Sequence, residues 1–220
     1  MMTRKLTTAL VSAALVLGVT GTALANTVPG AVYSDSQAAS KSKTPEKVTE
    51  QLKAAGIKDV APDAYYAGAV TTLLESGLLT PDENGNVEPE APLGASEGVA
   101  VFAKVLGIAA KTDTPAEALA KAQQAGIASA DLTADTDLPR MEVARLLGKA
   151  LGVQPAAINA PEDYPFADYQ GLSQEDRGLL KALYDLGIFK GFEDKTFRPN
   201  SILTKAQIAI LVDRILGARQ

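Results

Sequence analysis

The sequence predicts an all-α protein in which three pseudo-repeated helical hairpin units, joined by short irregular loops, pack around a common core. Three observations support this prediction. Segments of the chain recur at regular spacing, each recurring unit carries an apolar stripe of helical period, and helix start and stop signals dominate from Thr44 onward.

The recurring unit is a helix that ends on glycine plus an apolar residue, then a loop, a leucine and a second helix. The glycine pairs are Gly77-Leu78, Gly126-Ile127 and Gly187-Ile188, and the leucines are Leu93, Leu138 and Leu203. The glycine-to-leucine distances are 16, 12 and 16 residues, so the middle loop is four residues short. An acid or amide stands four residues past each leucine and 10 before the next glycine: Glu97, Glu142 and Gln207. We predict repeats at about 57–108, 109–153 and 164–217, within a domain of residues 44–220.

The second helix of each unit carries apolar residues at i, i+3, i+4, i+7 and i+8, which lie on one face of an α-helix. They are Gly98, Val101, Phe102, Val105 and Leu106; Val143, Leu146, Leu147, Ala150 and Leu151; and Ile208, Leu211, Val212, Ile215 and Leu216. A short hairpin cannot bury such a face alone, so the units are expected to pack on one another.

The N-terminus has the pattern of a secretory signal peptide over residues 1–25. Arg4 and Lys5 precede an apolar run at 9–19, and Ala23-Leu24-Ala25 supplies a small-x-small cleavage site. The alternative is a membrane anchor, but eleven helical residues span only about 16 Å of a hydrocarbon core of about 30 Å. Residues 26–43 are rich in small and polar residues and are expected to form a flexible leader.

Composition excludes several classes of function. The signal peptide holds two basic residues and no acidic ones, so the mature chain has 19 basic and 26 acidic side chains, a net charge of −7. This charge disfavours nucleic acid and anionic lipid as partners, and no later apolar stretch is long enough to span a membrane. The chain contains no cysteine and no histidine, which removes disulfides, thiolate sites and a Ser-His-Asp triad. We therefore expect no enzyme, no cofactor and no metal site, and an acidic glycosidase stays only as a minor alternative.

The third unit resembles the S-layer homology repeat. The likeness rests on Phe166-Ala167-Asp168, Gly187-Ile188-Phe189-Lys190-Gly191, Asp194 to Asn200 and Leu203 to Gln207. The first unit is similar through Asn84-Gly85-Asn86-Val87 and Pro89, and the second mainly through Gly126-Ile127 and Leu138 to Glu142. The resemblance implies a pseudo-threefold helical domain that holds secreted proteins at the bacterial surface without a covalent bond. It also implies an acidic secondary cell-wall polysaccharide as the ligand, bound in grooves between repeats.

The candidate contacts stand at the starts of the second helices and in the preceding loops. Arg140 and Lys205 lie in the first helical turn, where a cation beside free N–H groups suits an anion; the alternative is a solvated surface cation. The first repeat has Ala95 at this position. By resemblance Thr204 lines the groove, and Tyr65 stands where the family usually has tryptophan. Asp194 is expected to form a turn with Lys195 and is a further tentative contact.

Other motif residues have structural interpretations. Glu97, Glu142 and Gln207 are expected to cap their helices, with Thr204 and Gln207 forming a capping box. Phe197 is expected to fill the core rather than to stack on sugar. Asp82 to Asn86 suggests a calcium loop, but Val87 and Leu93 replace the required glycine and glutamate, so a turn is expected.

Two functions remain open from the sequence. The first is non-covalent attachment to an acidic cell-wall polysaccharide, and the second is a protein–protein module that binds another surface protein. The absence of tryptophan and the eroded motifs favour the second.

Overall fold

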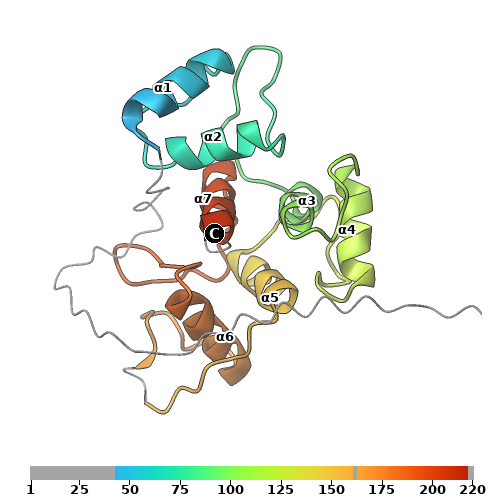
Figure 1. Cartoon of the computed structure of the whole chain (residues 1–220). Coiled ribbons are helices and arrows are strands. Elements are labelled where there is room, and N and C mark those ends of the chain that lie inside the picture. Colours follow the sequence, from blue (N-terminus) through green and yellow to red (C-terminus); the bar gives the residue numbers. More distant parts are fainter. Residues whose placement is uncertain (1–42, 161–162, 218–220) are drawn as a thin grey trace, which may run out of the picture. The chain divides into compact units, whose positions relative to one another are not determined.

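The computed structural model describes residues 43–160 and 163–217, which contain seven helices and no strand. The all-α prediction is therefore confirmed for this part of the chain. The helices are α1 (Pro45–Ala54), α2 (Ala67–Glu75), α3 (Ala95–Val105), α4 (Pro115–Gln124), α5 (Arg140–Leu151), α6 (Gln174–Asp185) and α7 (Lys205–Gly217) (Figure 1). The predicted signal peptide and the leader up to residue 42 lie outside the described residues.

Helix boundaries follow local capping chemistry. The Lys47 N–H donates to Thr44 Oγ1 over 3.4 Å at the start of α1. At α4, Thr114 and Glu117 form a reciprocal capping box, with the Thr114 N–H donating to the Glu117 carboxylate over 2.8 Å. Gly56 and Gly126 follow the two helices with φ of 69° and 71°, a conformation that glycine adopts without steric cost.

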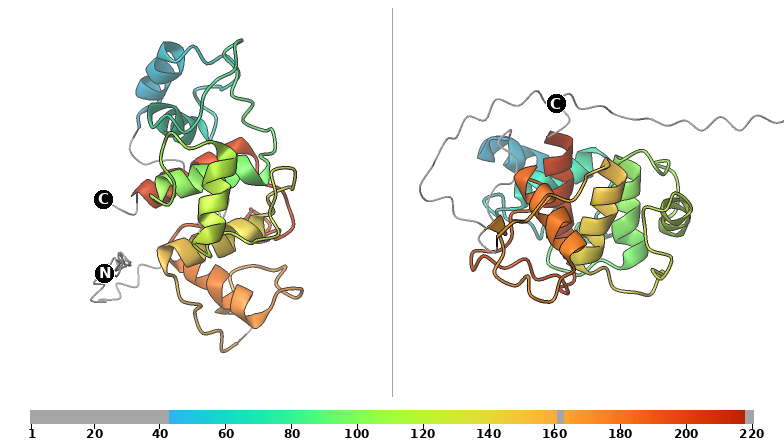
Figure 2. Two further views of the ribbon diagram at one scale, coloured as in Figure 1. Left: turned by 90° about the vertical axis from the view of Figure 1, so that its right-hand side faces the viewer. Right: turned by 90° about the horizontal axis from the view of Figure 1, so that it is seen from below.

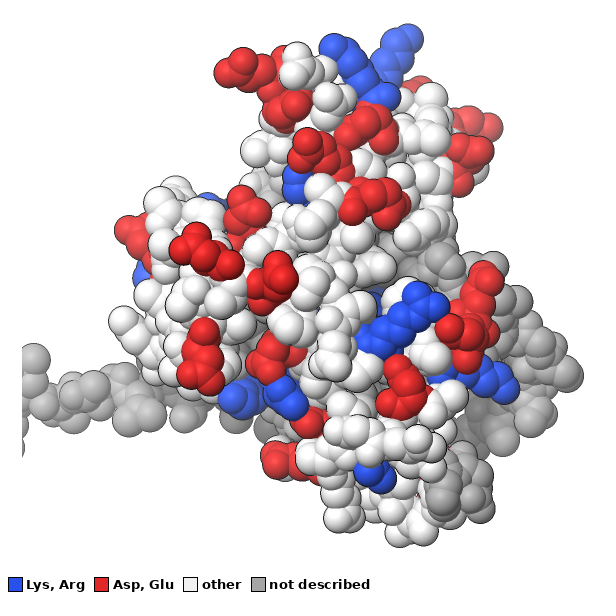
Figure 3. All heavy atoms as spheres, turned by 180° about the vertical axis from the view of Figure 1, so that it is seen from behind, with Lys and Arg blue, Asp and Glu red and all other residues white. Residues whose placement is uncertain are grey.

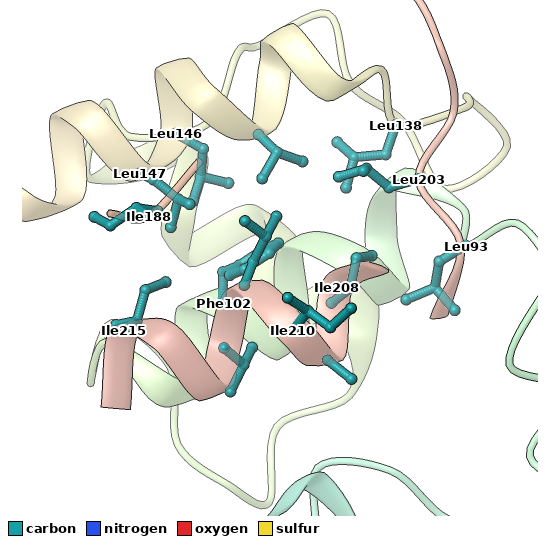
Figure 4. Close-up of a cluster of buried hydrophobic side chains, with 14 of the residues drawn as sticks. Leu93, Phe102, Leu138, Leu146, Leu147, Ile188, Leu203, Ile208, Ile210 and Ile215 are labelled. Carbon is teal, nitrogen blue, oxygen red and sulfur yellow. The ribbon is translucent and has the colours of Figure 1, made fainter. Parts of the chain in front are cut away.

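The core is built mainly on α3, α5 and α7, whose apolar stripes are buried or half-buried as predicted. Leu93, Leu138 and Leu203, which precede these helices, are 7%, 0% and 0% exposed. Figure 4 shows Leu138 beside Leu203, with side chains of the three helices directed into one cluster. Phe197 is also fully buried, as expected of a core residue.

The two helices of a predicted unit are not each other's main partners. The principal helix pairs are α3 with α4, α2 with α7, and α5 with α6, while α1 packs on α2 and α3 contacts α7 (Figures 1 and 2). The hairpins that the sequence predicted, such as α2 with α3, are not among these pairs. Each first helix instead packs on the second helix of another unit, because that helix offers the larger apolar face.

The starts of α3, α5 and α7 meet through their backbones. Isolated antiparallel bridges join Pro92 with Thr204, Gly94 with Asp137, and Pro139 with Ile202. The Leu93 N–H donates to the Leu203 carbonyl over 3.1 Å, which joins loops 110 residues apart in the sequence. These bonds bring the three loops that carry the candidate binding residues to one place.

Candidate ligand-binding site

Arg140 is completely buried among aromatic rings. Its side chain is 0% exposed, and its guanidinium carbon lies 5.1 Å from the ring centre of Phe189, 5.1 Å from that of Phe192 and 4.9 Å from that of Phe197. A cation over a ring face is attracted by the ring quadrupole, more strongly when water is excluded. The interpretation of Arg140 as a solvated surface cation is therefore wrong, because the loop of the third repeat covers it.

Burial sets the electrostatics around Arg140. It lowers the pKa of Arg140 to about 9, and the nearby cations Arg214 and Arg198 lower it further, while Asp168 acts in the opposite direction. Burial also lowers the pKa of Arg214 to about 10, and its Nη1 donates to the Ile188 carbonyl over 3.0 Å. Three guanidinium groups thus repel one another around one carboxylate, a balance that favours an incoming anion.

Next to this cluster lies an open hollow of about 420 Å³, lined by Phe192, Glu193, Asp194 and Arg198. The Arg198 guanidinium lies 4.0 Å from the centre of the Phe192 ring and donates to the Asp194 carboxylate over 2.9 Å. Bonds from Thr196 and Arg198 lower the pKa of Asp194 to about 2. Asp194 thus orients Arg198 at the surface, and Phe192 separates the hollow from Arg140.

The loop that presents Arg198 is held by Asp168. Its carboxylate accepts the N–H groups of Phe197 and Arg198 over 2.8 and 2.7 Å. Arg198 has a φ of 58°, a left-handed conformation that costs an ordinary residue roughly 1–2 kcal/mol. The carboxylate therefore stabilises a turn that the backbone alone disfavours.

The first repeat uses the same device. Asp59 accepts the Val87 N–H over 3.0 Å and the Glu88 N–H over 2.6 Å, and Glu88 has a φ of 51°. Glu88 and Arg198 are equivalent, since both stand five residues before the conserved-position leucines Leu93 and Leu203 of their repeats. The two turns share their backbone but present opposite charges.

Lys205 lies against this first-repeat turn. Its Nζ donates to the Glu88 carboxylate over 3.1 Å, and its side chain is 22% exposed. Tyr65 is 39% exposed and packs edge-to-face on Tyr66, with ring centres 4.9 Å apart. Burial and then the charge of Glu90 raise the pKa of Tyr65. The structure thus places Lys205 and Tyr65 beside acidic residues of the same segment, 88–90.

The N–H groups expected to receive an anion are already occupied. At α5, the N–H groups of Arg140 and Met141 donate to the carbonyls of Ser201 and Pro199, each over 2.9 Å. At α7, the Lys205 N–H donates to the Ala91 carbonyl over 3.0 Å. The predicted pocket of cation plus free N–H groups is therefore not formed, because loops of neighbouring repeats cap these helices.

The three predicted helix caps differ. Thr204 and Gln207 form the expected box, in which each side-chain oxygen accepts the other residue's N–H over 3.3 Å. Glu142 instead pairs with Arg145, because the residue at the cap position is Pro139, which has no N–H to donate. Glu97 is exposed and makes no hydrogen bond with any described residue, so the caps expected of Glu97 and Glu142 are absent.

Two other classes of site are not found in the described part of the chain. No cluster of three or more acidic residues there could hold a metal ion. Asp82 accepts the N–H groups of Asn84 and Asn86 over 2.9 and 2.8 Å, as in a simple turn. None of the helices in residues 43–160 and 163–217 has the length and apolar character needed to cross a membrane. Figure 3 shows acidic side chains scattered over one face, with basic ones in smaller groups between them.

Sequence reasoning missed Arg198, Phe192 and the role of Asp168. Arg198 occupies a variable position inside a turn motif, so nothing in its spacing marks it as a contact. The equal spacing of Asp59 and Asp168 before their turns, 28 and 29 residues ahead of Val87 and Phe197, was the available signal for the carboxylates.

Comparison with known families assigns the two better-preserved units. The sequence model described as "S-layer homology domain" matches residues 56–93 and 165–209, the segments that contain the two Asp-held turns. The match does not include the middle unit, whose loop is shorter and lacks a positive-φ residue. A search of curated proteins finds no match.

Proposed function

Because the chain carries S-layer homology repeats, we propose that it binds an acidic secondary cell-wall polysaccharide without a covalent bond and without catalysis. S-layer homology domains are cell-surface anchoring modules that bind cell-wall polymers. A location at the cell surface follows from that family role. The acidic polysaccharide and the residues that contact it are our proposal.

The arginine cluster beside the 420 Å³ hollow is the observation that carries this proposal. Arg198 is the accessible cation, while Arg140 and Arg214 add positive potential from behind the Phe192 ring. A carboxylate on the polymer would pair with the planar guanidinium of Arg198 and relieve the repulsion among the three cations. Phe192 supplies an apolar face next to this charge, which suits the mixed polar and apolar surface of a sugar.

The first-repeat turn supports a weaker second contact. Lys205, Thr204 and Tyr65 are near one another there, but Glu88 neutralises Lys205 and Glu90 lies beside Tyr65. An acidic polymer would meet like charges at this place. We therefore assign the main contact to the third repeat and Asp194 to the positioning of Arg198.

Co-sedimentation with cell-wall sacculi tests the proposal. The purified protein is mixed with native sacculi and with sacculi stripped of secondary polysaccharide, and binding to native sacculi alone is expected. Arg198→Gln should lower that binding at least ~10-fold, the loss of one charge-assisted bidentate contact. Lys121→Ala, which removes an exposed cation on α4, is the matched control and should bind normally. Equal binding of folded Arg198→Gln and wild-type protein would refute the assignment.

A further inference from the structure

A second hollow, of about 260 Å³, lies where α2, α3 and α7 meet. Its floor is aliphatic and includes Leu73, Leu79, Val101 and Ile208, and its polar groups are few. Lys104 lies at its edge, half-buried, and makes no hydrogen bond or ion pair with any described residue. The hollow therefore combines an apolar floor with one unneutralised ammonium group.

The equivalent place in the third repeat is filled by the chain itself. Positions 110 residues apart correspond between the first and third repeats, since Gly77 matches Gly187 and Leu93 matches Leu203. Where the first repeat has Leu79 and Lys104, the third has the larger Phe189 and Arg214. The basic residues that enter from the preceding second helices are Lys205 in the open place and Arg140 in the filled one. The hollow thus follows from three smaller side chains on a repeated backbone.

We propose that this hollow binds a peptide segment of another surface protein, which inserts one leucine-sized side chain and places an adjacent carboxylate on Lys104. The aliphatic side chain replaces the volume that Phe189 occupies in the third repeat. The carboxylate supplies the partner that Lys104 lacks among the described residues. A half-buried ammonium gains more from such pairing than a solvated one does.

The chemistry of the lining favours a peptide over a sugar. Sugar hydroxyls need hydrogen-bonding partners when they leave water, and most of this lining is aliphatic carbon. The lining contains no aromatic ring on which a sugar could stack. A branched aliphatic side chain makes neither demand and gains from leaving water.

The proposal is independent of polysaccharide binding, since the two hollows share no residue. The probes are three capped tetrapeptides, acetyl-Ala-Leu-Asp-Ala-amide, its Asn analogue and its Gly-Asp analogue, and binding is followed by methyl NMR of the purified protein. We expect the Leu-Asp peptide to shift the methyl signals of Leu79 and Ile208 saturably, with a dissociation constant on the order of 1 mM. The Asn analogue should bind about 5-fold more weakly, and the Gly-Asp analogue should not bind.

Variants give each part of the proposal its own readout. Leu79→Phe copies the third repeat and should abolish binding, while Leu186→Phe, the same change at an exposed leucine, should not. Lys104→Gln should make the Asp and Asn peptides bind equally, and it tests the charge even if Leu79→Phe does not fold. Arg198→Gln should leave peptide binding unchanged, which separates this proposal from the polysaccharide site. Absent saturable shifts, undiminished binding to folded Leu79→Phe, or a dimer of the free protein that Leu79→Phe dissociates would each overturn it.

Discussion

Replacement of Asp168 by alanine tests how the third-repeat turn is held. The carboxylate accepts two backbone N–H groups over 2.8 and 2.7 Å, and one belongs to Phe197, which is fully buried. A hydrogen bond to a charged group contributes about 1.5–3 kcal/mol, so Asp168→Ala should lower the free energy of unfolding by about 3–5 kcal/mol. Asp168→Asn keeps one side-chain oxygen as acceptor and should cost about half as much.

Urea denaturation followed by circular dichroism measures these changes. Asp59→Ala, which removes the equivalent bonds in the first repeat, should have an effect of similar size. Asp135→Ala is the control, since Asp135 is exposed and makes no hydrogen bond with a described residue, and its effect should stay within about 0.5 kcal/mol. A cost below about 1 kcal/mol for Asp168→Ala would mean that water replaces the carboxylate, and would refute the reasoning.

Three further changes give results of different kinds. The lowering of the pKa of Arg140 from 12.5 to about 9 corresponds to about 5 kcal/mol against the charged form, and three ring contacts at up to about 2 kcal/mol each nearly offset it. In urea denaturation, Arg140→Met should therefore change the unfolding free energy by less than about 2 kcal/mol, while Arg140→Ala, which leaves a cavity, should cost about 3–5; a larger loss for Met would contradict this. The pKa of Asp194 falls from 3.8 to about 2 on folding, so its bonds stabilise the fold above pH 4 and lose that effect as the pH falls through 2. NMR titration of its carboxyl should show a midpoint near 2, and a midpoint near 4 would exclude the pairing with Arg198. Gln207→Ala should cost about 1 kcal/mol through the lost cap, whereas Glu97→Ala should cost less than 0.5, and equal effects in thermal denaturation would be evidence against the assigned caps.

Features that depend on neighbouring residues could be predicted. The starts of α1 and α4 lie where Thr44 and Thr114 cap them, because a cap acts within one helical turn. The stripe of Ile208, Leu211 and Ile215 is buried because helical period alone places these residues on one face. The cap expected at Glu142 was wrong for an equally local reason, the proline at position 139, which the sequence already displayed.

The candidate site depended on distant residues. Arg140 and Lys205 stand at equivalent positions, yet one is enclosed by three phenylalanines and the other pairs with Glu88, 117 residues away. Nothing within a helical turn of either residue distinguishes them. Their surroundings come from loops of another repeat.

The sequence by itself determined the helical class, the periods of the repeats, the buried stripes and the likeness to the S-layer homology repeat, since all of these are properties of residues close together in the chain. The tertiary structure alone decided that first helices pack on another unit, that Arg140 is buried and that the hollow near Lys104 is open. These outcomes depend on side-chain volumes and charges brought together from repeats about 110 residues apart, such as Leu79 against Phe189. Local patterns carry no information on such pairings, because burial is set by what packs on a residue and not by the residue itself.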